Sequence, residues 1–339
     1  MSHAPAVSVI VPLYNKRETI ARTINSILAQ TFQSFELLIV DDQSTDGSKE
    51  IVRQFNDPRV QLMQQANAGP GTARNAGIRA SCAEWVAFLD ADDEWMPDYL
   101  QRAMRDLHRN RQCDVYCGGR FWDPGHVSRE PFHRSLGIVP GPWRLDPATP
   151  AARMKLLIEF FFAGSTLARR DVLLHYGGFY EQHCTFGEDI YLWLQIALNH
   201  WIYRDPAPAA IWHREDSDLS AGRPRHYPVP PILTDPEPLR HSCPAEYRDA
   251  LERYLSNYAW LTAERFAWQG DGKTCRQLLR QYAASLEQNT IRLQLLSWVS
   301  PLIAAARSVP FLRKTARKWR RRASALSHSK PKTAATARS

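Results

Sequence analysis

The sequence predicts an α/β fold in which a mostly parallel central sheet is flanked by helices and followed by a C-terminal helical extension. Over the first 110 residues, continuous apolar segments rich in β-branched residues alternate with amphipathic segments, which is the pattern of successive βαβ units. The connections between these segments are short. Amphipathic helical patterns return between residues 244 and 298. These observations together favour a sheet covered on both faces.

The expected elements follow one another in regular alternation. Strands are expected at 7–13, 35–40, 60–63, 85–89 and near 115, and helices at 16–30, up to 55, 69–80 and 97–108. Residues 123–150 are rich in Pro, Gly, Arg and His and are expected to form loops. A strand at 165–168, a helix from 171 and a helix at 188–199 are expected next, and the proline-rich stretch 222–244 is expected to be an extended linker.

The positive charge of the chain is concentrated at its C-terminal end. The chain of 339 residues has a formal net charge of +8, but residues 304–339 contain 11 Lys or Arg and no Asp or Glu. The rest therefore carries 32 basic and 35 acidic residues, a balance of −3. Body-wide binding of a nucleic-acid duplex is excluded as the default interpretation, and no specific nucleic-acid partner is expected.

Cysteine usage and hydropathy favour a cytoplasmic protein. The six cysteines show no CxxC spacing, and a pair of half-buried thiols explains Cys113 and Cys117 better than a metal site does. No segment approaches the ~18–20 apolar residues that a membrane span needs. The N-terminal residues lack the basic region of a signal peptide.

Acidic clusters follow two of the expected buried strands. Asp41 and Asp42 end the second strand, and Asp90, Asp92 and Asp93 follow the fourth. Ligands of such sheets bind beyond the carboxyl ends of the strands, and carboxylates two residues apart can hold Mg²⁺ or Mn²⁺ together with substrate phosphates. The alternative is a solvated acidic turn that only precedes the next helix.

Several segments together resemble family 2 glycosyltransferases, which have the GT-A fold. They are VSVIVPLYN (7–15), VDDQSTDGS (40–48), NAGPGTARNAG (67–77), WVAFLDADDEWMPDYL (85–100), GGFYE (177–181), GEDIYLWL (187–194) and WHR (212–214). The resemblance implies a GT-A domain over 1–222, with a nucleotide-binding half at about 1–110 and an acceptor half at about 111–222. A proline-rich linker (223–243), a helical extension (244–300) and a basic tail (301–339) would follow.

The resemblance also implies which residues bind the nucleotide-sugar. Pro12, Tyr14 and Asn15 would border the nucleoside. Asp42, together with Asp41, would accept a hydrogen bond from the base or ribose, although both carboxylates could instead cap the following helix. Arg74 would approach the base or diphosphate, unless it is a solvated arginine on a helix face.

The metal site is implied in the same way. Asp92 would be the direct ligand of Mn²⁺ or Mg²⁺, and Asp90 would lie near the ribose or the metal. His213 would supply a third ligand, with a purely structural histidine as the alternative. Arg214 would lie on a loop over the diphosphate.

In the family's pattern, Asp189 would be the general base that deprotonates the acceptor hydroxyl, and Glu188 would orient the acceptor or the base. Acidic residues in a first helical turn can also serve only to complement the helix dipole. A single displacement would invert the anomeric centre. The chain lacks a QxxRW motif and has Gln195 where relatives often have Arg, so transfer of one sugar is favoured over processive polymer synthesis.

The sequence therefore predicts a metal-dependent, inverting glycosyltransferase in cell-surface polysaccharide synthesis. UDP is the expected nucleotide, with GDP and TDP as alternatives, and the acceptor is a glycan or a lipid-linked sugar. A sugar nucleotidyltransferase and a non-catalytic GT-A binding protein are the rival interpretations. The basic tail with its interleaved aromatic residues suits an anionic membrane surface at the inner face of the cell membrane; the alternative is a disordered tail that binds nothing specific.

Overall fold

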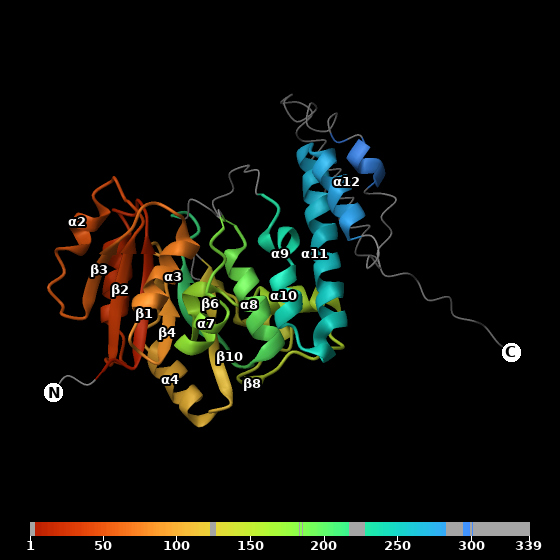
Figure 1. Cartoon of the computed structure of the whole chain (residues 1–339). Helices are drawn as coiled ribbons and strands as arrows, with labels where there is room; N and C mark the ends of the chain where they lie inside the picture. The colour runs from red at the N-terminus through yellow and green to blue at the C-terminus, as the bar shows by residue number, and fades with distance from the viewer. Residues whose placement is uncertain are drawn as a thin grey trace. The chain divides into compact units, whose positions relative to one another are not determined.

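The computed structural model describes residues 4–122, 127–182, 184, 186–216, 228–282, 294–298 and 300. The chain divides into two compact units, residues 1–254 and residues 255–339. The first unit is built around one mixed sheet with helices packed against it (Figure 1). This unit contains every residue that the sequence assigns to the functional site.

The N-terminal half of the sheet is parallel, as the alternating pattern predicts. Its strands are β1 (Val7–Leu13), β2 (Phe35–Asp41), β3 (Val60–Gln64) and β4 (Trp85–Phe88). They lie in the order β3-β2-β1-β4, and each neighbouring pair is parallel. The buried strands β1, β2 and β4 consist almost wholly of apolar residues because both of their faces are covered.

The second half of the sheet mixes strand directions. Its strands are β5 (Glu94–Trp95), β6 (Cys113–Trp122), β7 (Val127–Ser128), β8 (Gly141–Trp143), β9 (Thr166–Arg169) and β10 (Trp201–Trp212). β9 lies between β4 and β6 and is antiparallel to both, whereas β10 is parallel to β6. Strands β6 and β10 therefore point the same way as β1, β2 and β4. Their carboxyl ends all lie at one edge of the sheet.

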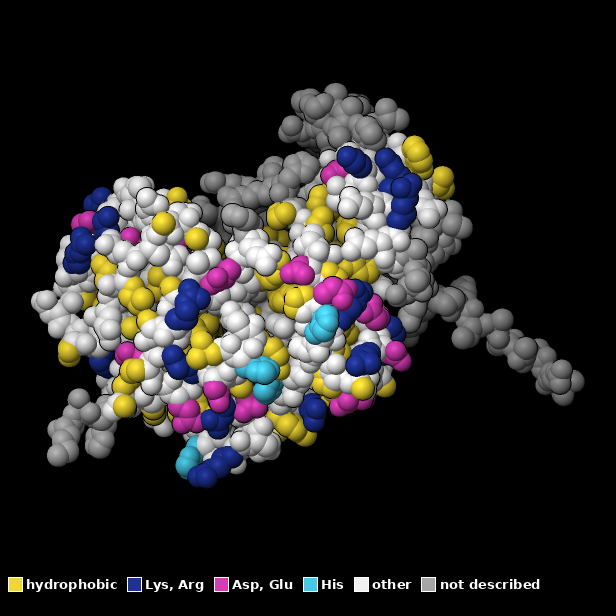
Figure 2. All heavy atoms as spheres, viewed as in Figure 1, with side chains coloured by type: hydrophobic (Ala, Val, Ile, Leu, Met, Phe, Trp, Pro, Cys, Tyr) yellow, Lys and Arg dark blue, Asp and Glu magenta, His cyan; other side chains and the backbone are white. Residues whose placement is uncertain are grey.

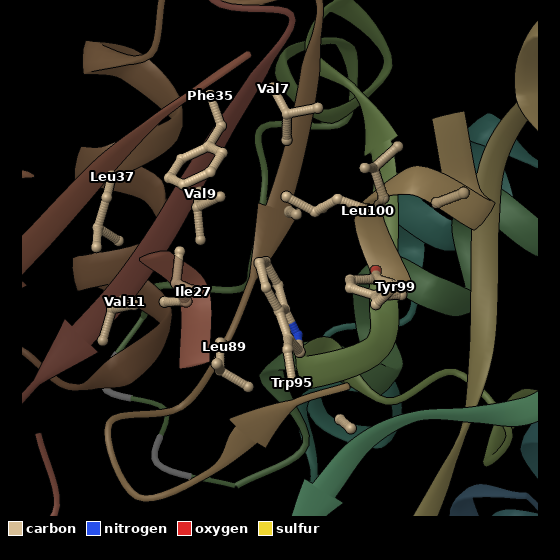
Figure 3. Packing of buried hydrophobic residues seen from close by; sticks show 14 of the residues in the cluster. Val7, Val9, Val11, Ile27, Phe35, Leu37, Leu89, Trp95, Tyr99 and Leu100 are labelled. Atoms are coloured by element: carbon tan, nitrogen blue, oxygen red, sulfur yellow. The ribbon is translucent and has the colours of Figure 1, made fainter. Parts of the chain in front are cut away.

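Helices cover both faces of this sheet. The helices of the sheet region are α1 (Ile20–Leu28), α2 (Ser48–Val52), α3 (Pro70–Ala80), α4 (Tyr99–Arg109), α5 (Glu130–Ser135), α6 (Ala151–Ile158), α7 (Arg170–His175) and α8 (Glu188–Asn199), with a short 3₁₀ turn at Ala163–Ser165. Val9 of β1 and Ile27 of α1 belong to one buried cluster, which Figure 3 shows together with the aromatic pair Trp95 and Tyr99, 4.9 Å apart between ring centroids. On the opposite face, a Cβ atom at Gly77 would lie only 2.5 Å from Ile10, so this glycine lets α3 approach β1.

Strand β10 and the elements within 123–150 differ from the sequence-based expectation. Residues 123–150 were expected to be loops, but the described part contains β7, α5 and β8. β10 was not expected at all, because Pro206 and Pro208 interrupt its pattern. In the structure the pairing of β10 with β6 shifts register on either side of Pro208. These irregularities accommodate residues that cannot donate to a regular ladder.

The proline-rich segment is not an extended linker in its described part. It forms α9 (Pro231–Thr234) and α10 (Glu237–Ser242), whose prolines stand at helix starts where the missing N–H costs no hydrogen bond. The side chains of Ile232, Leu233 and Leu239 are fully buried. Their burial explains why the segment folds onto the first unit instead of running free.

The last described elements begin with a 3₁₀ turn (Ala245–Tyr247) and α11 (Arg248–Gln269), and α12 (Gly272–Gln281) follows. Asp271 caps α12 by accepting a hydrogen bond from the amide of Thr274. Across the described residues, no helix combines the length and the hydropathy that crossing a bilayer requires. The basic tail, 301–339, lies outside the described residues.

Candidate functional site: an acidic sheet edge bridged by Arg74

Arg74 joins two acidic motifs that are almost one hundred residues apart in the sequence. Its Nη2 atom lies 2.5 Å from Oδ1 of Asp90, and its Nη1 atom lies 3.1 Å from Oε1 of Glu188. The side chain of Arg74 is only 6% exposed. Burial alone would lower the pKa of this guanidinium, but Asp90 and Glu188 outweigh burial and raise it. Arg74 is therefore a buried, paired cation and not a solvated one.

Local contacts hold the Glu188 segment against the helix that carries Arg74. The side chain of Asn75 donates to the carbonyl of Phe179 and accepts from the amide of Phe179, at 2.7 and 2.8 Å. Gly178 has a φ of +78°, and a Cβ atom there would lie 2.1 Å from Oδ1 of Asn75. Only glycine fits this close approach. The GGFYE segment is thus fixed beside α3, and the Phe179 ring lies 5.1 Å from the Arg74 guanidinium.

The two acids that begin α8, Glu188 and Asp189, both have raised pKa values. Burial and the charge of Asp189 raise the pKa of Glu188 to about 7, against the lowering effect of Arg74. Burial also raises the pKa of Asp189, Arg74 opposes this shift, and Asp90 adds to it. Gly187, with a φ of +83°, precedes the helix and turns the chain so that both acids fall in the first helical turn. Such perturbed carboxyl groups are typical of sites that move a proton.

Asp92 lies at the same edge and is paired with a lysine that the sequence did not single out. Nζ of Lys16 is 2.8 Å from Oδ2 of Asp92 and donates to the carbonyl of Asp216 at 2.6 Å. Burial and the neighbouring Asp90 raise the pKa of Asp92, and Lys16 opposes this shift. Two carboxylates so placed suit a divalent cation, although no cluster of three metal-ligating side chains occurs among the described residues. Phosphate oxygens of a substrate would have to complete the ligand set.

A second arginine ties the loop after β10 to the acidic turn. Nη2 of Arg22 bonds both to the carbonyl of Asp92, at 2.6 Å, and to Oδ2 of Asp216, at 2.8 Å. Its Nε lies 3.4 Å from Oε1 of Glu94. Lys16 and Arg22 were not among the residues that the sequence predicted. Lys16 precedes α1 and Arg22 lies within it, and neither belongs to a recognisable motif, so only the tertiary contacts identify them.

His213 lies beside the acidic turn but faces residues other than Asp92. Its backbone amide donates to Oδ1 of Asp93 at 3.0 Å, and its Nε2 lies 2.8 Å from Oε1 of Glu94. The other oxygen of Asp93 is buried without a hydrogen-bond partner among the described residues, and burial with the charge of Asp92 raises the pKa of Asp93 well above its ordinary value. To bind a metal through Nε2, His213 would have to exchange Glu94 for the ion.

The acids at the end of β2 organise the neighbouring loops. Asp42 accepts hydrogen bonds from the amides of Ala68 and Gly69, both at 2.9 Å, and from the side chain of Gln65 at 2.8 Å. Asp41 accepts from the amide of Ser44 at 3.1 Å. Asp42 thereby fixes the turn that leads into α3. Its contact with a base or ribose stays a prediction.

The residues expected around the nucleoside surround the end of β1. Pro12 is in β1, Tyr14 is 50% exposed, and Asn15 has a φ of +49° with its side-chain oxygen accepting from the amide of Thr45 at 2.9 Å. Arg214 is exposed after β10, with its guanidinium 5.4 Å from the Trp212 ring centroid. These residues and the acidic clusters all follow strands whose carboxyl ends share one edge. On the face shown in Figure 2, Lys and Arg side chains lie among Asp and Glu.

The family model for glycosyl transferase family 2 matches residues 8–177, half of the chain. The chain belongs to glycosyl transferase family 2. This family match confirms the resemblance found in the sequence, and its span includes Asp42, Arg74, Asp90 and Asp92 but ends before Glu188.

Curated relatives match over part of their length. The chain is 36% identical over 143 residues to the UDP-Glc:alpha-D-GlcNAc-diphosphoundecaprenol beta-1,3-glucosyltransferase WfgD of Escherichia coli, covering 39% of this chain and 56% of WfgD. It is 39% identical over 112 residues to the putative teichuronic acid biosynthesis glycosyltransferase TuaG of Bacillus subtilis, covering 32% and 44%. An uncharacterised glycosyltransferase of Nostoc is 48% identical over 99 residues, covering 28% and 31%. The chain thus spans between about a third and just over half of these relatives.

Solved structures show the same fold over most of the chain. Residues 1–349 of Staphylococcus aureus TarS match with a TM-score of 0.65 at 20% identity, covering 93% of this chain and 91% of that one. TarS in complex with UDP-GlcNAc matches with a TM-score of 0.64 at 18% identity, covering 94% and 92%. These likenesses confirm the α/β fold with its C-terminal helices. At 18–20% identity, these matches establish the fold and not the function.

Proposed function

We propose that this protein is an inverting, metal-dependent glycosyltransferase that moves one sugar from a UDP-sugar to a hydroxyl of a glycan or lipid-linked acceptor. The observation that carries the proposal is the Arg74 bridge, which ties Asp90 of the acidic turn to Glu188 of α8. The bridge keeps the turn that would hold the donor next to the start of α8, where Asp189 would receive a proton. Relatives named for teichuronic acid and succinoglycan biosynthesis support a role in cell-surface polysaccharide synthesis.

In the proposed reaction Asp189 accepts the proton of the acceptor hydroxyl as that oxygen attacks the anomeric carbon. A raised pKa makes Asp189 a better base once it is ionised. Glu188 and Arg74 orient it: the guanidinium holds Glu188, and its positive charge favours the ionised form of Asp189. A single displacement on the face opposite the leaving diphosphate inverts the configuration and needs no covalent intermediate.

Asp92, with Asp90 beside it, would hold the divalent cation together with the diphosphate. When bound, the cation would offset the charge that builds on the leaving nucleoside diphosphate. Lys16 forms an ion pair with Asp92 and so places a positive charge at this position. The side chain of Asp42, the turn at Tyr14 and Asn15, and Arg214 would border the nucleotide. The basic tail would place the protein at the inner face of the cell membrane, next to lipid-linked substrates.

The proposal is tested by measuring nucleoside diphosphate release from a panel of nucleotide-sugars with Mn²⁺ or Mg²⁺. Asp189→Asn should lower turnover by about 10²–10⁴-fold while leaving UDP affinity intact, since it removes a general base. Asp92→Asn should weaken the binding of UDP together with Mn²⁺. The matched control is Asp249→Asn, at an exposed position in the first turn of α11, which should behave like the wild type. Equal turnover in all four proteins would remove the catalytic assignments.

A further inference from the structure

A group of cationic and aromatic side chains lies at the carboxyl ends of β6 and β10. Arg120 belongs to β6, and its guanidinium carbon lies 4.8 Å from the ring centroid of Phe162 and 5.7 Å from that of Trp212. The two rings are 6.0 Å apart and tilted by 45°. Arg214 lies 5.4 Å from the same Trp212 ring. These four residues are called the Arg120 cluster below.

Arg120 has no carboxylate partner among the described residues, in contrast to Arg74 and Arg102 of the first unit. Arg74 is paired with two acids, and Arg102 is paired with Asp205 and Asp98. Within the described part of the chain, no carboxylate forms an ion pair with Arg120, and its Nε is buried without a hydrogen-bond partner. Burying a cation without a partner costs free energy. A bound anion would offset that cost.

A second cation, Arg129, acts on Arg120. Burial lowers the pKa of Arg120, and Arg129 lowers it further, while Cys117, Asp93 and Glu159 oppose these effects. Burial together with Arg120 and Arg129 lowers the pKa of His133 to about 4, so His133 is neutral near pH 7. The charges of Arg129 and Arg120 therefore repel each other, and a bound anion would offset this repulsion.

We propose that the Arg120 cluster is the acceptor subsite and that it recognises a phosphoryl anion attached to the acceptor sugar. This inference rests on the proposed function. A guanidinium can hold two phosphate oxygens at once, and the flanking rings of Phe162 and Trp212 offer apolar surface to a sugar ring. The cluster lies at the same edge of the sheet as the acidic turn, because β6 and β10 point the same way as β4.

Binding measurements test this subsite without relying on turnover. Three probes are titrated into the full chain in the presence of saturating UDP and Mn²⁺, so that the donor position is filled: GlcNAc-diphosphate on a short alkyl chain, free GlcNAc-1-phosphate, and neutral octyl GlcNAc. The wild type should bind a phosphorylated probe at least about tenfold more tightly than octyl GlcNAc. Tighter binding of the alkyl diphosphate than of GlcNAc-1-phosphate identifies a lipid-linked acceptor, and equal binding identifies a free sugar phosphate.

Arg120→Met should lower the affinity for the phosphorylated probes by about 10- to 100-fold, the usual range for a charge-assisted hydrogen-bonded contact. Its affinity for octyl GlcNAc should be unchanged. Arg120→Lys keeps the charge but loses the planar guanidinium, so its affinity for the phosphorylated probes should lie between those of the wild type and Arg120→Met. The matched control Arg53→Met, at an exposed position that forms an ion pair with Glu50, should bind like the wild type. The melting temperature of Arg120→Met without ligand should equal or exceed that of the wild type, since an uncompensated buried cation is gone.

Three results would overturn the subsite. The wild type could bind phosphorylated and neutral probes equally, or Arg120→Met could bind the phosphorylated probes as well as the wild type does. Arg120→Met could also weaken the binding of UDP and leave the binding of the probes unchanged, which would place Arg120 in the donor site. A protein that binds the probes as expected but shows no sugar transfer would refute the proposed function and leave the subsite standing.

Discussion

Replacing Arg74 with methionine should destabilise the protein in a strongly pH-dependent manner. Arg74 is 6% exposed and pairs with Glu188, whose side chain is 10% exposed. Methionine fills most of the volume but leaves Glu188 buried without its cation. Removing one partner of a buried ion pair typically costs about 3–5 kcal/mol. That cost exists only when Glu188 is ionised.

The direction of the pH effect follows from the raised pKa of Glu188. Its ordinary value is 4.5 and its value in the folded protein is about 7. Between these two values the folded state keeps a proton that the unfolded state has lost, so the free energy of unfolding falls as pH rises. At about 1.4 kcal/mol per pH unit, the fall amounts to about 3 kcal/mol in the wild type. Without Arg74 the pKa of Glu188 rises further, and the fall continues above pH 7.

Urea denaturation followed by circular dichroism at pH 5 and pH 8 measures the difference. Arg74→Met should lose about 1 kcal/mol at pH 5, where only the pair with the partly exposed Asp90 is missing, and about 2–2.5 kcal/mol at pH 8, since the decline continues for about one further pH unit. The double variant Arg74→Met, Glu188→Gln should recover the additional loss at pH 8, because the charge of Glu188 is no longer buried without its cation. A loss that is equal at both pH values, or a double variant no more stable than Arg74→Met, would refute the buried-pair reasoning.

Three further outcomes are expected. Asp42→Ala should lower the free energy of unfolding by about 1.5–3 kcal/mol in urea titrations, since it removes the charge-assisted hydrogen bonds to the amides of residues 68 and 69; a loss below 0.5 kcal/mol would contradict this. Lys16→Met should tighten Mn²⁺ binding in the presence of UDP by about three- to tenfold in calorimetry, because Lys16 competes for Asp92; weaker binding would instead make Lys16 a donor ligand. A chain ending at Ser300 should lose binding to vesicles containing anionic lipid, and unchanged binding would exclude the tail as an anchor.

The fold could be predicted wherever apolar periodicity and chain order agree. Residues 7–13 and 188–199 form a strand and a helix with the expected bounds, because each is a long segment of one pattern. β10 escaped prediction because Pro206 and Pro208 resemble a loop, and only the pairing with β6 shows that bulges absorb them. Short elements such as α5 and β8 carry too few residues for a period to show.

The site could be predicted as a set of acids but not as a network. The sequence places Asp90 and Asp92 after a buried strand and Asp189 at a helix start, and the structure brings Asp90 and Glu188 together through Arg74. Nothing in the sequence indicates that Lys16 would meet Asp92 and Asp216, because those contacts join residues up to 200 positions apart. Which side chains contact one another depends on the tertiary fold, whereas the chemistry of each side chain can be read from the sequence.

The distribution of charge along the edge of the sheet ties the two proposals together. The acidic turn and the start of α8 concentrate carboxylates whose ionisation is unfavourable until a cation arrives, as the raised pKa values of Asp92 and Glu188 indicate. At the ends of β6 and β10, burial and the charge of Arg129 lower the pKa of Arg120, so that its charged form is disfavoured there. A cation bound with a nucleotide diphosphate would satisfy the first region, and a phosphorylated acceptor would satisfy the second. In this arrangement, part of the binding energy of the two substrates would be available to hold the acceptor hydroxyl between Asp189 and the donor sugar.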